Sequence, residues 1–192
     1  MLGRVITYSE KGIKYEADPR HAEIIVEMLN LTNTKPVGSP GWKEEPDEGE
    51  PLEGEERTAY RALSARVNYL AQDRPDIQFA GKEICRFMQN PKSSDWMKLK
   101  KLGRYLRGKM RLVYHFQWQG KPPTLTGYTD TNWAGCSRTR RSTSAGGVMY
   151  GRHLIRCYSK TQATIALLSA EAELGGHCED QRRSARPIGH DG

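Results

Sequence analysis

The sequence lacks a long apolar run and lacks paired cysteines. No segment approaches the roughly 20 consecutive apolar residues that a membrane-spanning helix needs, and the N-terminus shows no signal-peptide pattern. The four cysteines, Cys85, Cys136, Cys157 and Cys178, lie far apart and form no Cys-x-x-Cys pair of the kind that holds zinc or a redox disulfide. We therefore expect an intracellular protein, cytoplasmic or nuclear, with reduced thiols and no membrane partner.

Apolar residues are also scarce. Only 36% of the 192 residues are hydrophobic, which is enough for a modest core in one medium domain or two small ones. Charged residues are common, at 28% of the chain, and the formal net charge is +7. The uneven distribution of this charge is more informative about function than its total.

Residues 33–56 form an acidic stretch rich in proline and glycine. They contain eight Asp or Glu residues and two Lys, so the stretch carries −6 and the rest of the chain carries +13, which is +7 minus −6. Four prolines and four glycines interrupt it. Such a composition cannot bury apolar surface, and we therefore expect a linker that marks the main domain boundary.

The positive charge is concentrated in the middle of the chain. No acidic residue occurs over the 34 positions 96–129, whereas eight Lys or Arg residues do. A helix is expected from Ser94, as N-cap, to Gly108, with Lys100, Arg104 and Arg107 in a stripe beside its apolar side. Clustered cations bind phosphate backbones in a salt-sensitive manner, so these three residues are candidates for nucleic-acid binding. A solvated charged face is the alternative.

Local patterns predict several elements before that helix. Residues 5–15 alternate weakly, as in a short hairpin. Asp18 and Pro19 fit the N-cap and first turn of a helix. Two more helices are expected at about 56–72 and 75–88, separated where a proline interrupts the pattern.

The last part of the chain combines a strand and a helix that both carry acidic residues. Residues 125–133 alternate as a strand does and place Asp130 in its middle. Glu171 and Glu173 then open a helix that begins at about Ser169. An acidic group on a strand that faces another on a neighbouring helix is how a divalent-metal nuclease holds Mg²⁺ through oxygen ligands.

Four motifs occur in this region in a specific order: Gly-Tyr-Thr-Asp-Thr-Asn-Trp-Ala-Gly at 127–135, Arg-Arg-Ser-Thr-Ser at 140–144, Ser-Lys-Thr-Gln at 159–162 and Ser-Ala-Glu-Ala-Glu at 169–173. Together they resemble the ribonuclease H domain of copia-type LTR retrotransposon polyproteins. Residues 60–91 and 99–108 look like the segment that joins reverse transcriptase to ribonuclease H in that family. The resemblance covers about residues 2–174.

The resemblance implies an α/β chain of the α+β kind, in which a helical connection segment precedes a ribonuclease H-like mixed sheet. Residues 147–150 and 154–158 would be the second and third strands of that sheet. The family's activity is hydrolysis of RNA in RNA–DNA hybrids with Mg²⁺, or with Mn²⁺ in its place. By resemblance, Asp130 matches the first catalytic aspartate and Glu171 the catalytic glutamate, and Glu173 is the alternative metal ligand.

The resemblance is lost just after Leu174. Gly175 and Gly176 each cost about 1 kcal/mol relative to Ala inside a helix, so we expect the helix to stop there. The tail lacks the strand that carries the family's third catalytic aspartate, which leaves two metal ligands of about four. We therefore expect weak Mg²⁺ binding, at most trace nuclease activity and an open sheet edge.

These expectations divide the chain into five parts. They are the end of a reverse transcriptase part (1–32), the acidic linker (33–56), the helical basic connection segment (57–118), a truncated ribonuclease H-like domain (119–176) and an irregular tail (177–192). We interpret the chain as a fragment of a retroelement Pol polyprotein that can associate with the rest of that polyprotein and with RNA–DNA hybrid. A non-catalytic nucleic-acid-binding module and an inert remnant are the other two interpretations.

Overall fold

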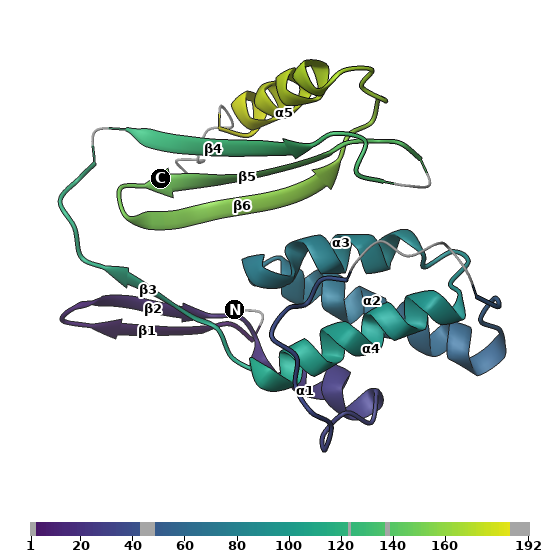
Figure 1. Ribbon diagram of the computed structural model, residues 1–192. Helices are drawn as coiled ribbons and strands as arrows, with labels where there is room; N and C mark the ends of the chain where they lie inside the picture. Colours follow the sequence, from purple (N-terminus) through teal and green to yellow (C-terminus); the bar gives the residue numbers. More distant parts are fainter. Residues whose placement is uncertain (1–2, 43–48, 123, 137–138, 185–192) are drawn as a thin grey trace. The chain divides into compact units, whose positions relative to one another are not determined.

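The computed structural model describes residues 3–42, 49–122, 124–136 and 139–184, with residues 177–184 described by their backbone alone. The chain forms two compact units, Met1–Trp118 and Gln119–Gly192. The described residues of the first unit combine four α-helices with a three-stranded sheet, and those of the second combine one helix with another such sheet (Figure 1), so the α+β class is confirmed. Every strand pair among the described residues is antiparallel, and the second sheet is therefore not mixed over this part of the chain.

The first unit contains a sheet with strand order β1-β2-β3. The predicted hairpin is confirmed as β1 (Val5–Ser9) and β2 (Gly12–Glu16). The third strand, β3 (Val113–Gln117), pairs with β2 and was not predicted. Sequence reasoning missed it because a five-residue strand is defined by its partner, and this partner lies about a hundred positions earlier.

Four helices pack around the core of this unit. They are α1 (Pro19–Met28), α2 (Gly54–Ala71), α3 (Gln78–Arg86), which follows a 3₁₀ turn at Pro75–Ile77, and α4 (Ser93–Gly108). All were predicted to within a few residues. The expected N-cap Ser94 is wrong, because Lys92 occupies the cap position and the Asp95 carboxylate accepts from its backbone N–H at 3.0 Å. Asp95 therefore closes this helix end as a capping-box acid does.

A buried arginine connects the break between α2 and α3 to the end of α4. Arg74 is only 1% exposed. Its guanidinium donates to the Asp76 carboxylate at 2.9 and 2.8 Å and to the carbonyls of Lys109 and Met110 at 3.0 and 3.2 Å. The Tyr105 hydroxyl also donates to Asp76, at 2.9 Å. The chain segments at both ends of this network are thereby fixed in one arrangement.

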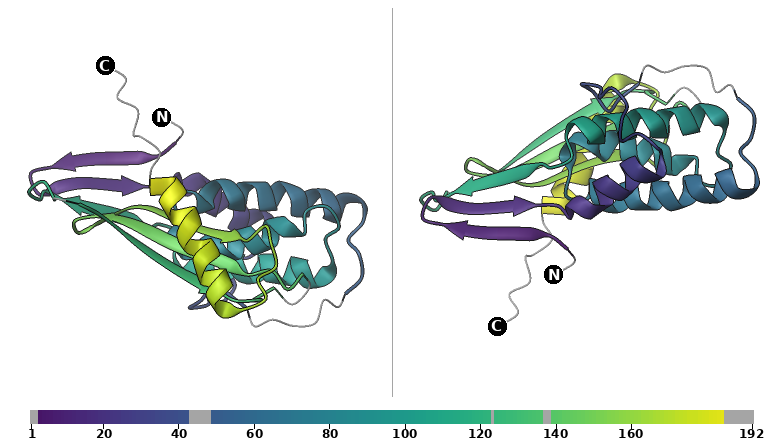
Figure 2. Two further views of the ribbon diagram at one scale, coloured as in Figure 1. Left: turned by 90° about the horizontal axis from the view of Figure 1, so that it is seen from above. Right: turned by 90° about the horizontal axis from the view of Figure 1, so that it is seen from below.

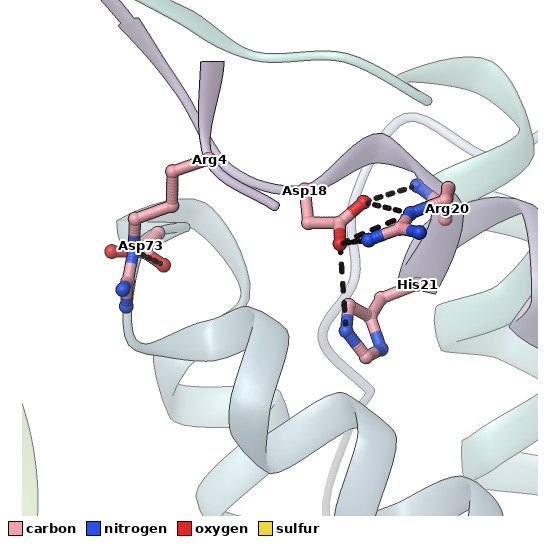
Figure 3. Close-up of polar contacts among 5 residues, drawn as sticks. All are labelled: Arg4, Asp18, Arg20, His21 and Asp73. Carbon is pink, nitrogen blue, oxygen red and sulfur yellow. Dashed lines mark hydrogen bonds and ion pairs between the residues drawn. The ribbon is translucent and has the colours of Figure 1, made fainter. Parts of the chain in front are cut away.

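Two acidic side chains hold the N-terminal strands and α1 in place (Figure 3). The Asp73 carboxylate accepts from Arg4 Nε at 2.7 Å and from the Tyr15 hydroxyl at 2.5 Å. Asp18 caps α1, as predicted, by accepting from the backbone N–H of Arg20 at 3.1 Å. The Arg20 guanidinium, which hydrogen-bonds the same carboxyl, holds the pKa of Asp18 below its usual range.

The second unit is one sheet covered by one helix. Its strands β4 (Leu125–Asn132), β5 (Thr143–Tyr150) and β6 (His153–Thr161) pair in the order β4-β5-β6. Helix α5 (Ser169–Ser184) crosses this sheet obliquely (Figure 2). The three predicted strands are confirmed, although β5 and β6 are longer than expected. Among the described residues β4 has a partner on one side only, which matches the open edge that was expected.

The expected helix stop at Gly175 and Gly176 is wrong. Helix α5 continues to Ser184, so residues 177–184 are helical rather than irregular. A Cβ added to Gly176 would lie 2.6 Å from Thr131 Oγ1, which means that only glycine lets the helix approach β4 so closely. The helix is also bound to the sheet by Gln162, whose Nε2 donates to the Ala172 carbonyl at 2.8 Å. This tertiary contact outweighs the helix propensity of two glycines.

Replacing Arg74 with Met should lower the free energy of unfolding by about 3 to 5 kcal/mol, because the Asp76 carboxylate and two backbone carbonyls lose their buried donor. Urea unfolding followed by circular dichroism measures this. The exposed Lys11→Gln serves as the control and should leave the midpoint unchanged. Equal midpoints for Arg74→Met and the wild type would contradict the role given to this network.

Replacing Gly176 with Val should destabilise the second unit by about 1 to 3 kcal/mol, because the new side chain overlaps Thr131 and pushes α5 off the sheet. The matched control is Gly120→Val, since a Cβ at Gly120 meets no atom within 4 Å. Thermal unfolding of the two variants tests the difference. A Gly176→Val protein as stable as Gly120→Val would show that the close approach is not required.

Candidate functional site

Asp130, the predicted catalytic aspartate, lies in the middle of β4 and is exposed. It pairs in register with Ala145 of β5. One carboxylate oxygen accepts a hydrogen bond from the backbone N–H of Thr131 at 2.9 Å. The side chain thus takes part in a local contact on its own strand.

Helix α5 covers the other face of β4. A Cβ at Gly176 would lie 2.6 Å from Thr131 Oγ1 and 3.4 Å from Thr129 Oγ1, so both threonines face the helix. Successive side chains of a strand point to opposite faces. Asp130, which lies between these threonines, therefore points away from α5 and from the two glutamates at its start.

The two glutamates are on the first turns of α5 and both are exposed. The Glu171 carboxylate accepts from the backbone N–H of Leu167 at 2.7 Å and so satisfies a donor just before the helix begins. This is the structural role of an acidic residue at a helix N-terminus. Glu173 is two positions further along, on a different side of the helix.

The predicted ligands for Mg²⁺ or Mn²⁺ are therefore not brought together. Asp130 lies on one face of the sheet, whereas Glu171 and Glu173 belong to the helix on the other. Over the described ranges no three His, Cys, Asp or Glu residues form a group that could hold a metal ion. A hard divalent cation needs several oxygen ligands around one point, so these residues do not fit a two-metal nuclease centre.

The predicted nucleic-acid-binding residues Lys100, Arg104 and Arg107 do share one side of α4. They occur at intervals of four and three residues, and all three side chains are half-buried. Buried leucines occupy the adjoining side: Leu99, Leu102 and Leu106. The apolar and basic sides of α4 are therefore arranged as the sequence predicted, and the binding role of the basic side remains a prediction.

The segment Thr32–Trp42, here called the strap, lies against this basic side. Arg104 Nε donates to the Lys35 carbonyl at 2.9 Å, and Arg107 Nε donates to the Thr32 carbonyl at 2.7 Å. Val37 and Trp42 of the strap pack against the hydrophobic core. The expectation that this stretch buries no apolar surface is wrong for its described residues.

Sequence reasoning missed the strap because composition averages over residues with different roles. Val37 and Trp42 are large apolar side chains inside an acidic stretch, and they were the available signal. The other end of the stretch is attached as well, since the Glu50 carbonyl accepts from the backbone N–H of Ser93 at 2.9 Å. Such main-chain contacts cannot be predicted from a sequence pattern, because they do not depend on side-chain type.

Proteins similar to this chain include a retrotransposon Pol polyprotein and two proteins with other names. The "Retrovirus-related Pol polyprotein from transposon TNT 1-94" of Nicotiana tabacum is 31% identical over 162 residues, which is 80% of this chain and 12% of that polyprotein. The "Uncharacterized mitochondrial protein AtMg00810" of Arabidopsis thaliana is 28% identical over 174 residues, 90% of this chain and 71% of that protein. The "Secreted RxLR effector protein 161" of Plasmopara viticola is 33% identical over 112 residues, 58% of this chain and 78% of that protein.

The chain spans only 12% of the TNT 1-94 polyprotein, so it corresponds to a small part of it. No protein-family model matches the chain, and no solved structure matches it significantly. No helix of the described residues is sufficiently long and apolar to cross a membrane.

Replacing Glu171 with Ala should destabilise the start of α5 by about 1 kcal/mol, because the Leu167 N–H loses its acceptor. Glu173→Ala is the matched control, since it removes the same charge from the same helix. Amide hydrogen exchange of residues 167–172 measures the effect. Equal exchange rates in the two variants would show that Glu171 has no capping role.

Proposed function

Because the chain belongs to the family of Pol polyproteins of copia-type LTR retrotransposons, we propose that it is a Pol segment that binds nucleic acid without cleaving it. In this proposal the second unit is a ribonuclease H-like domain that lacks an assembled metal centre. The first unit supplies the binding surface. The activity, substrate and partners of a whole Pol polyprotein are not carried over to the chain beyond this proposal.

One observation carries the proposal: Asp130 points away from the helix that bears Glu171 and Glu173. A two-metal hydrolase needs its carboxylates within reach of ions roughly 4 Å apart. Carboxylates on opposite faces of a sheet cannot meet this requirement. Mg²⁺ binding by these residues should therefore be weak, and RNA cleavage should be at most a trace.

The basic side of α4 supports the binding half of the proposal. Lys100, Arg104 and Arg107 form one row of three cations, within 34 consecutive positions that contain no acid. Each cation that contacts a phosphate releases condensed counterions, which makes the affinity fall with salt. An RNA–DNA hybrid, the nucleic acid acted on in the resembled family, is the ligand proposed.

The test for cleavage uses a labelled RNA–DNA hybrid with Mg²⁺ or Mn²⁺, beside an EDTA control. We expect no product above the EDTA control in the wild type and no change in Asp130→Asn. Binding of the same hybrid in EDTA should be retained and should weaken as salt rises. Metal-dependent cleavage that Asp130→Asn abolishes would overturn the proposal.

The test for binding uses Lys100→Gln, and the matched control is Lys82→Gln on α3, which removes one charge elsewhere in the same unit. The slope of log affinity against log salt concentration is negative, and its magnitude should decrease by roughly 0.7 to 0.9 for Lys100→Gln and stay unchanged for Lys82→Gln. Equal slopes in the two variants would show that α4 is not the binding surface. Fluorescence anisotropy at several salt concentrations measures both.

A further inference from the structure

The strap makes a close, two-point contact with the C-terminal half of α4. A Cβ added to Gly108 would lie 2.9 Å from Pro36 Cβ, so the strap passes directly over the end of the helix. Leu31, just before the strap, is buried and would lie 2.6 Å from a Cβ at Gly103. The two strap carbonyls that meet the arginines, those of Thr32 and Lys35, are consequently held in place by packing on both sides.

Each arginine uses only its Nε to bond the strap. Arg104 Nε reaches the Lys35 carbonyl at 2.9 Å, and Arg107 Nε reaches the Thr32 carbonyl at 2.7 Å. A guanidinium has five N–H donors in a planar fork. The single bond to the strap orients the plane of the fork, and among the described residues no other contact occupies its two Nη groups.

We propose that the strap carbonyls hold the side chains of Arg104 and Arg107 in one orientation, in which the two guanidinium groups bind neighbouring phosphates of one nucleic-acid strand. Lys100 binds the next phosphate in the same row. This inference rests on the proposed nucleic-acid binding of α4 and names how that surface is built. Side chains three and four positions apart on a helix have Cβ atoms about 5 to 6 Å apart, a spacing comparable to that of successive phosphates. Thr32 and Lys35 are positioning residues that act through their backbone.

Prior fixation of the arginines favours binding for an entropic reason. A flexible side chain loses rotamer freedom when a ligand immobilises it, and this loss opposes association. Arg104 and Arg107 have already given up this freedom in forming the strap bonds. Their forks can donate two hydrogen bonds to one phosphate, a bidentate contact that the compact ammonium of lysine cannot reproduce.

A second pair of arginines, on α2, makes similar contacts to backbone carbonyls and serves as a control for the pair on α4. Arg57 and Arg61 of α2 also lie one turn apart and donate to backbone carbonyls, those of Gln89 at 2.8 and 2.9 Å and of Met88 at 2.7 Å. Their surroundings differ, because the first turn of α2 is acidic. Helix α2 therefore repeats the arginine–carbonyl contact without a row of cations to bind a polyanion.

The first experiment compares two charge-conserving double variants of the full chain. A fluorescein-labelled RNA–DNA hybrid in EDTA is titrated, and anisotropy is followed at several KCl concentrations. Arg104→Lys with Arg107→Lys should weaken binding roughly tenfold with the salt slope unchanged. Arg57→Lys with Arg61→Lys should retain wild-type affinity. Wild-type affinity in the first variant, or an equal loss in the second, would overturn the proposal.

The second experiment displaces the strap without altering any charge. Gly108→Val should push Pro36 outward and weaken hybrid binding several-fold at an unchanged salt slope, whereas Gly38→Val, where a Cβ meets no atom within 4 Å, should bind normally. Tighter binding by Gly108→Val would show that the strap is a cover and overturn the proposal. If Gly108→Val does not fold, the lysine variants decide the question.

A separate outcome identifies failure of the proposed function itself. Wild-type protein whose hybrid binding does not depend on salt, or which does not bind the hybrid at all, has no phosphate-binding row for the strap to position. Salt-dependent binding that is lost in Lys100→Gln yet unaffected in Arg104→Lys with Arg107→Lys would retain the function and reject only the role of the strap.

Discussion

The buried guanidinium of Arg74 is the interaction on which the first unit depends. It joins the break after α2 to the two carbonyls that directly follow α4, those of Lys109 and Met110, and so links the basic helix to the helical pair α2–α3. A buried charge is tolerated only when its hydrogen bonds are met, and here Asp76 and two carbonyls meet them. Together with the buried leucines of α4, this network holds the helix that carries the row of cations.

In the second unit the corresponding constraint is the close approach of α5 to β4 at Gly176. The approach turns Thr129 and Thr131 toward the helix. Because strand side chains alternate, it also turns Asp130 away from the helix. The same contact that lets α5 run through two glycines thus separates the acidic residues that a ribonuclease H-like site would need together.

The two units differ in what they contribute to the proposed binding of nucleic acid without cleavage. Unit two retains the order of family motifs, but among its described residues Asp130 and the glutamates of α5 are not brought together. Unit one retains a basic helix whose arginines are held by the strap through main-chain carbonyls. The two proposed properties have different physical requirements, since phosphate binding needs only a row of cations whereas hydrolysis needs several ligands at one point.

The sequence by itself determined most of the local structure. The Asp18–Pro19 start of α1, the helices α2 to α4 and the strands β4 to β6 follow from caps, periodicity and the family motifs, all of which are local signals. The predicted row Lys100, Arg104 and Arg107 shares one side of α4 for the same reason. Tertiary structure alone decided the pairing of β3 with β2, the path of the strap, the continuation of α5 past Gly176 and the face on which Asp130 lies. These features depend on contacts between distant residues and on backbone groups, which every residue carries and no sequence pattern distinguishes.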